Sequence, residues 1–459
     1  MTTREIQHLY WRAGFGILPN DLDKARKKSK QSIIKELFNN SKNFTPLEID
    51  ISPVQEKTRV AFKNKDKKAT AEIQKMNRKL VRDYNLAWVS RLMNPKEILR
   101  ERMTLFWANH FVVRDNRISF VQEYNNMLRK YALGNFGDFV KAMSKQAAML
   151  KYLNNKQNKK QSPNENFARE LMELFTLGEG HYTENDIQQS ARAFTGYFHN
   201  LKGEFILKER QHDDAQKTFF GQTGYFDGDD IIEIILQEKQ CARFISEKIY
   251  RYFVNDSVNS DHIEEMVDVF YNTYNIEKLM THVFSAKWFY DEKNIGSKIK
   301  SPIDFIIGMN NVIPMNFKNK KTLFFIQKSL GQMLLYPPNV AGWKGGKNWI
   351  DSNTILLRMR YASIFLNKAH IPSKKKGDFG DPLARFFEGS GERLNYFKVT
   401  PDWEIFENNF KSVNTQDLQK YLIVSNLSKG TRDYLETLTK ASLKDYCIQL
   451  LSIPEYQMC

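Results

Sequence analysis

Two glutamates within one expected helix are the strongest candidates for chemistry. Glu170 and Glu173 lie three residues apart in the stretch from Ser162 to Leu177, SPNENFARELMELFTL, whose apolar residues recur at helical spacing. Two carboxylates on neighbouring turns can share a proton, hold a cation or divide the roles of general acid and general base. The alternative is an ordinary salt-bridged face, because Arg169 and Glu173 have the i,i+4 spacing of an ion pair.

Histidines supply further candidate proton carriers. His110 stands in the sequence WANHF, and His212 is followed directly by Asp213. Imidazole titrates near neutral pH and therefore suits acid, base or metal-ligand roles. A histidine flanked by aromatic residues is also typical of a hydrogen-bonded core position. The predicted catalytic set is Glu170, Glu173, His110, His212 and Asp213.

These residues do not form a recognised metal motif. The chain contains neither H-E-x-x-H nor the paired E-x-x-H of di-iron helical bundles. No metal ligands are therefore predicted, and the cofactor is left undefined.

A loop rich in glycine and tryptophan is the second distinctive element. It runs from Pro337 to Trp349 as PPNVAGWKGGKNW. Gly345 and Gly346 allow the backbone to approach a ligand closely, and Trp343 and Trp349 offer faces for stacking. Alternatively, both tryptophans anchor the loop on the helices. The predicted ligand-binding set is Asn109, Arg169, Arg192, Trp343, Gly345, Gly346 and Trp349.

A helical hairpin is expected to position the glutamates. Ser162, Pro163 and Glu165 have the spacing of a capping box with proline at the first helical position, and Gly178 suits the helix end. A second helix is predicted to start at Thr183, with Asp186 completing a similar box. Because the linker is short, Arg192 is expected to reach across to Glu170 or Glu173.

Composition predicts the fold class. Only 22 Gly and 13 Pro punctuate 459 residues, and 41% of the residues are hydrophobic. We expect an all-α protein with one helical domain over residues 1–459, including a long helix or helix pair over 55–94. A short irregular or β-hairpin-like insertion is expected near 200–226, and a loop at 371–395.

Charge and cysteine content limit the function classes. The formal net charge is +16, but the lysines gather in polar runs such as KARKKSK at 24–30, without aromatic residues between them. Nucleic-acid binding is therefore the least favoured hypothesis. Three cysteines without C-x-x-C spacing favour reduced thiols, and no signal peptide or membrane span is recognised. These features predict a cytoplasmic protein.

Several stretches in order along the chain resemble a bacterial family catalogued as domain of unknown function 1800. They include HLYWRAGFG at 8–16, RERMTLFWANHF at 100–111, the 35-residue motif at 163–197 and YPPNVAGWKGGKNWIDSNTILLRM at 336–359. The resemblance implies an all-helical bacterial protein whose activity is unassigned. Members are often exported, and many are encoded beside a family similar to alkaline phosphatases and sulfatases, which is a candidate partner.

Three function hypotheses follow. The first is an enzyme or ligand-binding protein with a polar cleft, acting by acid–base hydrolysis or group transfer. The second is a non-catalytic partner or scaffold, in which the same charged residues lock helix packing. The third is a basic nucleic-acid-binding protein.

Overall fold

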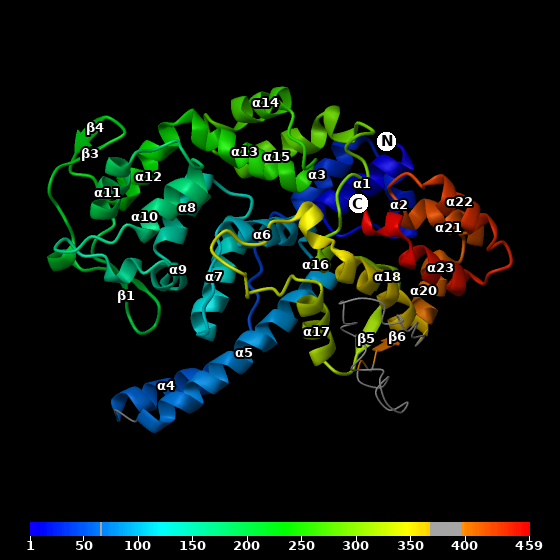
Figure 1. Ribbon diagram of the computed structural model, residues 1–459, viewed down its shortest axis with the longest axis horizontal. Helices are drawn as coiled ribbons and strands as arrows, with labels where there is room; N and C mark the ends of the chain where they lie inside the picture. Colours follow the sequence, from blue (N-terminus) through cyan, green and yellow to red (C-terminus); the bar gives the residue numbers. More distant parts are fainter. Residues whose placement is uncertain (65–66, 368–396, 398) are drawn as a thin grey trace.

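Helices dominate the molecule (Figure 1). The computed structural model describes residues 1–64, 67–367, 397 and 399–459, so the loop predicted at 371–395 lies outside the described residues. Within these ranges the only sheets are three of two strands each. The all-α prediction is therefore confirmed. None of the helices in these ranges has the length and hydropathy of a bilayer-crossing segment.

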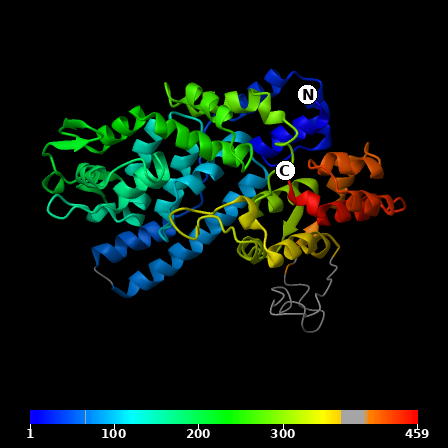
Figure 2. The ribbon, with the colours of Figure 1, turned by 45° about the horizontal axis from the view of Figure 1, so that its top comes forward.

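The first third of the chain contains a helical arm. The helices of this third are α1 (Thr3–Ala13), α2 (Pro19–Arg26), α3 (Lys30–Asn40), α4 (Ser52–Lys63), α5 (Lys67–Met93), α6 (Ile98–His110), α7 (Ile118–Tyr131), α8 (Phe136–Ser144) and α9 (Ala147–Tyr152). α4 packs along the outer half of α5, and the pair projects from the body (Figures 1 and 2). The helix pair predicted over 55–94 is confirmed.

The middle of the chain carries the charged motif and two hairpins. In order, its elements are α10 (Asn166–Glu170), the π-helix η2 (Leu171–Thr176), α11 (Glu184–Ala193), β1 (Tyr197–His199), β2 (Phe205–Leu207), β3 (Lys217–Phe219) and β4 (Gln222–Gly224). β1 pairs with β2 and β3 with β4, both antiparallel. The predicted insertion near 200–226 therefore consists of two short hairpins.

The remaining elements complete the body. They are α12 (Gly228–Gln237), α13 (Lys239–Phe253), α14 (Ser260–Phe270), α15 (Ile276–Ser285), α16 (Pro302–Val312), β5 (Met315–Phe317), α17 (Lys321–Ser329), α18 (Ser352–Asn367), β6 (Val399–Pro401), α20 (Trp403–Phe410), α21 (Leu418–Leu422), α22 (Lys429–Glu436) and α23 (Leu443–Ser452). β5 pairs antiparallel with β6 and so joins segments about eighty residues apart.

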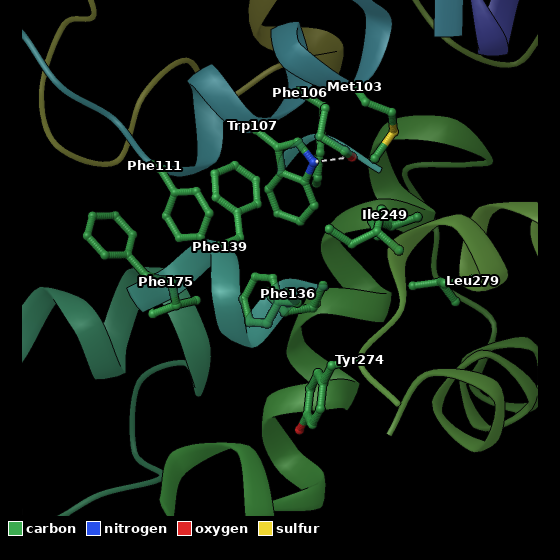
Figure 3. Packing of buried hydrophobic residues seen from close by; sticks show 14 of the residues in the cluster. Met103, Phe106, Trp107, Phe111, Phe136, Phe139, Phe175, Ile249, Tyr274 and Leu279 are labelled. Carbon is green, nitrogen blue, oxygen red and sulfur yellow. Dashed lines mark hydrogen bonds between the residues drawn. The ribbon is translucent and has the colours of Figure 1, made fainter. Parts of the chain in front are cut away.

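An aromatic core holds the helices of the first two thirds together. Trp107, Phe111, Phe139 and Phe175 come from α6, the residue after it, α8 and η2, and they point toward one another (Figure 3). The Trp107 indole donates a hydrogen bond to the Ala132 carbonyl oxygen at 3.0 Å, so its polar edge is satisfied within the core. A second apolar cluster packs mainly residues 303–456. One domain over 1–459 stays a prediction.

The helical hairpin differs from its predicted form at its start. α10 begins at Asn166, and Ser162 lies in an isolated bridge with Lys159. The Asn158 side chain accepts a hydrogen bond from the Asn164 backbone at 2.9 Å, which holds this segment as a turn. The capping box predicted at Ser162 and Glu165 is therefore wrong.

The other end of the first helix and the start of the second follow the sequence signals. Gly178 has a φ of +88°, as expected of a helix-ending glycine. The Thr183 hydroxyl accepts from the Asp186 backbone at 3.2 Å, and the Asp186 carboxylate accepts from the Thr183 backbone at 2.9 Å. This reciprocal box is confirmed, and it starts α11.

Candidate functional site

Glu170 and Glu173 lie at a change of helix type. α10 ends at Glu170, and the next six residues form the π-helix that contains Glu173. The backbone bond from Leu177 to the Met172 carbonyl, at 2.8 Å, spans five residues instead of four. Widened turns of this kind occur often at functional sites, because they redirect the side chains that follow.

The surroundings of Glu170 favour its protonated form. Partial burial raises the pKa of Glu170, and the nearby charge of Glu173 raises it further, while Arg169 lowers it. The Tyr182 hydroxyl donates a hydrogen bond to Glu173 Oε2 at 3.0 Å. Burial, together with this bond, raises the pKa of Tyr182 to about 12. Tyr182 therefore stays protonated and holds Glu173 in place at neutral pH.

One further group, the Tyr152 hydroxyl, lies close to Glu170. Burial raises the pKa of Tyr152, and the charges of Arg114 and Glu170 act on the same hydroxyl in opposite directions. The Arg114 guanidinium lies 5.7 Å from the centre of the Tyr336 ring. The carboxyl pair is therefore bordered by Tyr152 and Tyr182, which the sequence did not single out. Tyr182 was detectable in principle, since it lies in the short linker of the hairpin.

His110 lies on the core side of the same segment. Its Nε2 lies 3.0 Å from the Phe175 carbonyl oxygen, and aromatic rings surround the imidazole, including those of Phe106, Trp107 and Phe111. Burial, with a smaller effect of the Lys248 charge, lowers the pKa of His110 to about 3. The ring is therefore neutral at physiological pH, and its Nε2 hydrogen bonds the carbonyl. This is the core position that the aromatic flanks indicated as the alternative.

Arg169 does not pair with Glu173. Its guanidinium forms two hydrogen bonds of 2.9 Å with the Glu184 carboxylate at the start of α11 and a longer contact of 3.4 Å with Glu165. Glu165 directly precedes α10, and Glu184 is the first residue of α11. The i,i+4 pair with Glu173 is therefore not formed, and Glu173 binds Tyr182 instead.

Arg192 also has a different partner from the predicted one. Its Nε lies 2.7 Å from Asp213 Oδ2, so it does not cross to Glu170 or Glu173 as predicted. Although burial opposes ionisation, the hydrogen bond from Arg192 lowers the pKa of Asp213. His212 Nδ1 lies 2.8 Å from the Thr195 carbonyl, and Asp213 accepts nothing from it. The Arg192–Asp213 ion pair joins the insertion to α11 and lies apart from the two glutamates.

Asn109 binds the glycine–tryptophan loop. Its Nδ2 donates to the Trp343 carbonyl at 3.0 Å, and its Oδ1 accepts from the Trp343 backbone N–H at 2.8 Å. Gly342 has a φ of +73°, and a side chain there would collide with the Asn109 amide. The amide of Asn109 thus fastens the loop to the end of α6.

The glycine pair of the loop approaches another part of the protein. A Cβ atom at Gly346 would lie 2.8 Å from Asp256 Oδ2, and Asp256 pairs with Lys298. Trp349 is buried, with 9% of its surface exposed. Both features match the anchoring alternative, while ligand binding by Gly345, Gly346 and Trp349 stays a prediction.

Apart from His110 in the aromatic core and Arg169 paired with Glu184, the candidate residues lie in three places: the Glu170–Glu173–Tyr182 group, the Arg192–Asp213 pair with His212, and the loop held by Asn109. In the described ranges, no three His, Cys, Asp or Glu side chains are arranged to hold a metal ion. The first group alone combines coupled carboxyls with incomplete burial. It can donate and accept protons.

Comparison with known proteins identifies one family. The sequence model described as "Protein of unknown function (DUF1800)" matches residues 8–458, nearly the whole chain. Neither a curated protein nor a solved structure matches.

Proposed function

The chain belongs to the DUF1800 family, and we propose that it is an acid–base enzyme whose proton-carrying groups are Glu170 and Glu173. The reaction class is hydrolysis or group transfer. Glu170, whose pKa is raised, donates a proton to the leaving oxygen, and Glu173 accepts the proton of the attacking water or hydroxyl. Tyr182 holds the Glu173 carboxylate in position through its hydrogen bond.

One observation carries the proposal. Glu170 is the last residue of α10 and Glu173 stands in the π-turn after it, and the charge of Glu173 adds to burial in raising the pKa of Glu170. Carboxyl groups whose environments separate their pKa values are the usual source of an acid and a base in one site. The other ionisable candidates are hydrogen-bonded to structural groups: His110 to the Phe175 carbonyl, His212 to the Thr195 carbonyl and Asp213 to Arg192.

The first test measures the coupling directly. Carboxyl-carbon NMR follows the titration of Glu170 in the wild type and in Glu173→Gln. The pKa of Glu170 is expected to fall in the variant, because the neighbouring negative charge is removed while burial remains. Glu179→Gln, an exposed change three residues beyond the π-helix, is the matched control and leaves the titration unchanged.

The second test measures turnover on p-nitrophenyl acetate, phosphate, sulfate and glycosides. Glu170→Gln and Glu173→Gln are expected to lower kcat about 10²-fold or more, as removal of a general acid or base does. Glu179→Gln again serves as the control. Equal rates in all three variants contradict the proposal.

A second function is favoured by a different observation. Arg169, Arg192, Asp213 and Asn109 all make internal contacts with well-formed geometry. Such locked surfaces suit a scaffold that presents a rigid face to a protein partner. The candidate partner is the phosphatase- or sulfatase-like family encoded beside relatives. Co-purification of the two proteins, with wild-type turnover in Glu170→Gln, supports this alternative.

A further inference from the structure

A large cleft in the described part of the chain lies away from the glutamates. It has a volume of about 1540 Å³ and is walled by α1, α2, α5, α16, β5 and α20. In Figure 1 α1, α2, β5 and α20 lie on the side of the molecule that carries the C-terminal helices, and α5 lines the cleft with its C-terminal half. None of the residues predicted from sequence lines it. The cleft is independent of the proposed acid–base site.

Unengaged amides line this cleft. Asn94 follows α5, Asn316 stands on β5 and Asn409 on α20, and none of their side chains has a hydrogen-bond partner among the described residues. Two further asparagines of the lining are hydrogen-bonded within the protein. Asn310 Oδ1 accepts from the Met315 backbone at 3.1 Å, and Asn311 donates to the Phe15 carbonyl at 3.1 Å. Three separate elements therefore bring free donors and acceptors to one space.

The charged side chains that line the cleft are three lysines and four carboxylates, so the two signs nearly balance: Lys24, Lys28 and Lys320, and Asp21, Glu36, Asp83 and Asp402. Lys24 pairs with Asp21 at 2.9 Å and Lys28 with Glu36 at 2.6 Å. Asp402 accepts a hydrogen bond from the Ile405 backbone at the start of α20. A charged ligand would have to compete with these partners, whereas a neutral ligand leaves them intact.

Half-buried aromatic rings complete the lining. Tyr10, Phe317 and Tyr421 line the cleft, and the Tyr10 hydroxyl has no hydrogen-bond partner in the described chain. Burial, with added effects of Glu36 and Asp21, raises the pKa of Tyr10 to about 12, so its hydroxyl stays neutral and can donate. Flat apolar faces beside amide and hydroxyl groups match the two surfaces of a sugar ring.

From these observations we infer that the cleft binds a neutral oligosaccharide. Sites for single small molecules measure roughly 300–1,000 Å³, so a larger space suits a chain of several sugar units. Asn94, Asn316 and Asn409 bind the hydroxyl groups, and Tyr10, Phe317 and Tyr421 pack against the ring faces. An extended peptide is the competing occupant, because its backbone also pairs with amides.

The test measures binding by isothermal titration calorimetry to the full chain. The probes are hexasaccharides of glucose, galactose, mannose and N-acetylglucosamine in their common linkages, and an uncharged hexapeptide. Asn409→Ala and Asn316→Ala are the test variants. Asn408→Ala is the matched control, since Asn408 is exposed on the same helix α20 and does not line the cleft. Circular dichroism confirms that every variant is folded.

At least one hexasaccharide is expected to bind the wild type and the Asn408→Ala control equally. Its Kd is expected to rise about 3- to 10-fold in each test variant, the loss of roughly one neutral hydrogen bond. Three outcomes overturn the inference: no hexasaccharide binds, the test variants bind as tightly as the control, or only the peptide binds. None of these outcomes bears on Glu170 and Glu173, whose test is the carboxyl titration.

Discussion

The imidazole of His110 donates a hydrogen bond from Nε2 to the main-chain oxygen of Phe175, 3.0 Å away, at the π-turn that contains Glu173. A π-turn leaves carbonyl groups without their usual helical partners. The Phe175 carbonyl accepts its hydrogen bond from His110 of α6, and the Leu177 carbonyl accepts one from Gln240 Nε2 at 2.9 Å. Both long-range bonds stabilise the widened turn, so His110 acts as a positioning residue for the carboxyl pair.

Replacing His110 by phenylalanine tests this role. The ring volume is retained, but the donor is lost, which leaves the Phe175 carbonyl buried without its partner. We expect the free energy of unfolding to fall by about 1–3 kcal/mol, measured by urea denaturation. His181→Phe, at an exposed position, is the control and stays within about 0.5 kcal/mol of the wild type. An equal loss in both variants would show that the bond to Phe175 is unimportant.

The pH dependence of stability should carry the signature of His110. Its pKa is about 3 in the folded protein and about 6.5 when unfolded. Below pH 6.5 the unfolded state therefore takes up a proton that the folded state does not, and stability falls as the pH falls toward 3.

From pH 7 to pH 5 this effect amounts to about 2 kcal/mol. The stability advantage of the wild type over His110→Phe is expected to shrink by that amount over the same range. Urea denaturation of both proteins at pH 7, 6 and 5 measures it. A constant difference would mean that the folded His110 titrates normally.

The partner of Arg192 is testable by a double-mutant cycle. Arg192 and Asp213 lie 2.7 Å apart with side chains only 25% and 14% exposed, so solvent screens them incompletely. We expect a coupling energy of about 1–2 kcal/mol from the cycle with alanine at both positions. The corresponding cycle between Arg192 and Glu170 should give a value near zero. A larger coupling energy between Arg192 and Glu170 than between Arg192 and Asp213 would support the crossing predicted from the sequence.

The glycine–tryptophan loop offers a matched pair of substitutions. Gly342 and Gly331 have φ values of +73° and +87°, but only an added Cβ at Gly342 meets a neighbour, the Asn109 amide. Gly331→Ala should therefore cost about 1–2 kcal/mol for the backbone alone, and Gly342→Ala should cost more.

Hydrogen exchange gives the local readout for the same pair. The Trp343 amide donates to Asn109 and should lose its protection in Gly342→Ala and in Asn109→Ala, while retaining it in Gly331→Ala. Unchanged protection in Asn109→Ala would mean that other contacts hold the loop.

Local rules in the sequence determined much of the fold. Helical periodicity with few glycines and prolines predicted the all-α class, and the Thr183–Asp186 spacing predicted where α11 starts. The positive φ of Gly178 was likewise expected. Each of these signals depends on partners at short, constant offsets along the chain, so one sequence suffices to read them.

Only the tertiary structure shows which contacts hold the candidate residues in place. The π-turn depends on His110 and Gln240, each more than sixty residues from the carbonyl that it binds. The turn at Asn158 removed the cap expected at Ser162, and Asp213 took the guanidinium of Arg192. The amides of the cleft come from segments more than two hundred residues apart. Hydrogen bonds between distant segments have no set spacing, so a single sequence cannot specify which donors and acceptors meet.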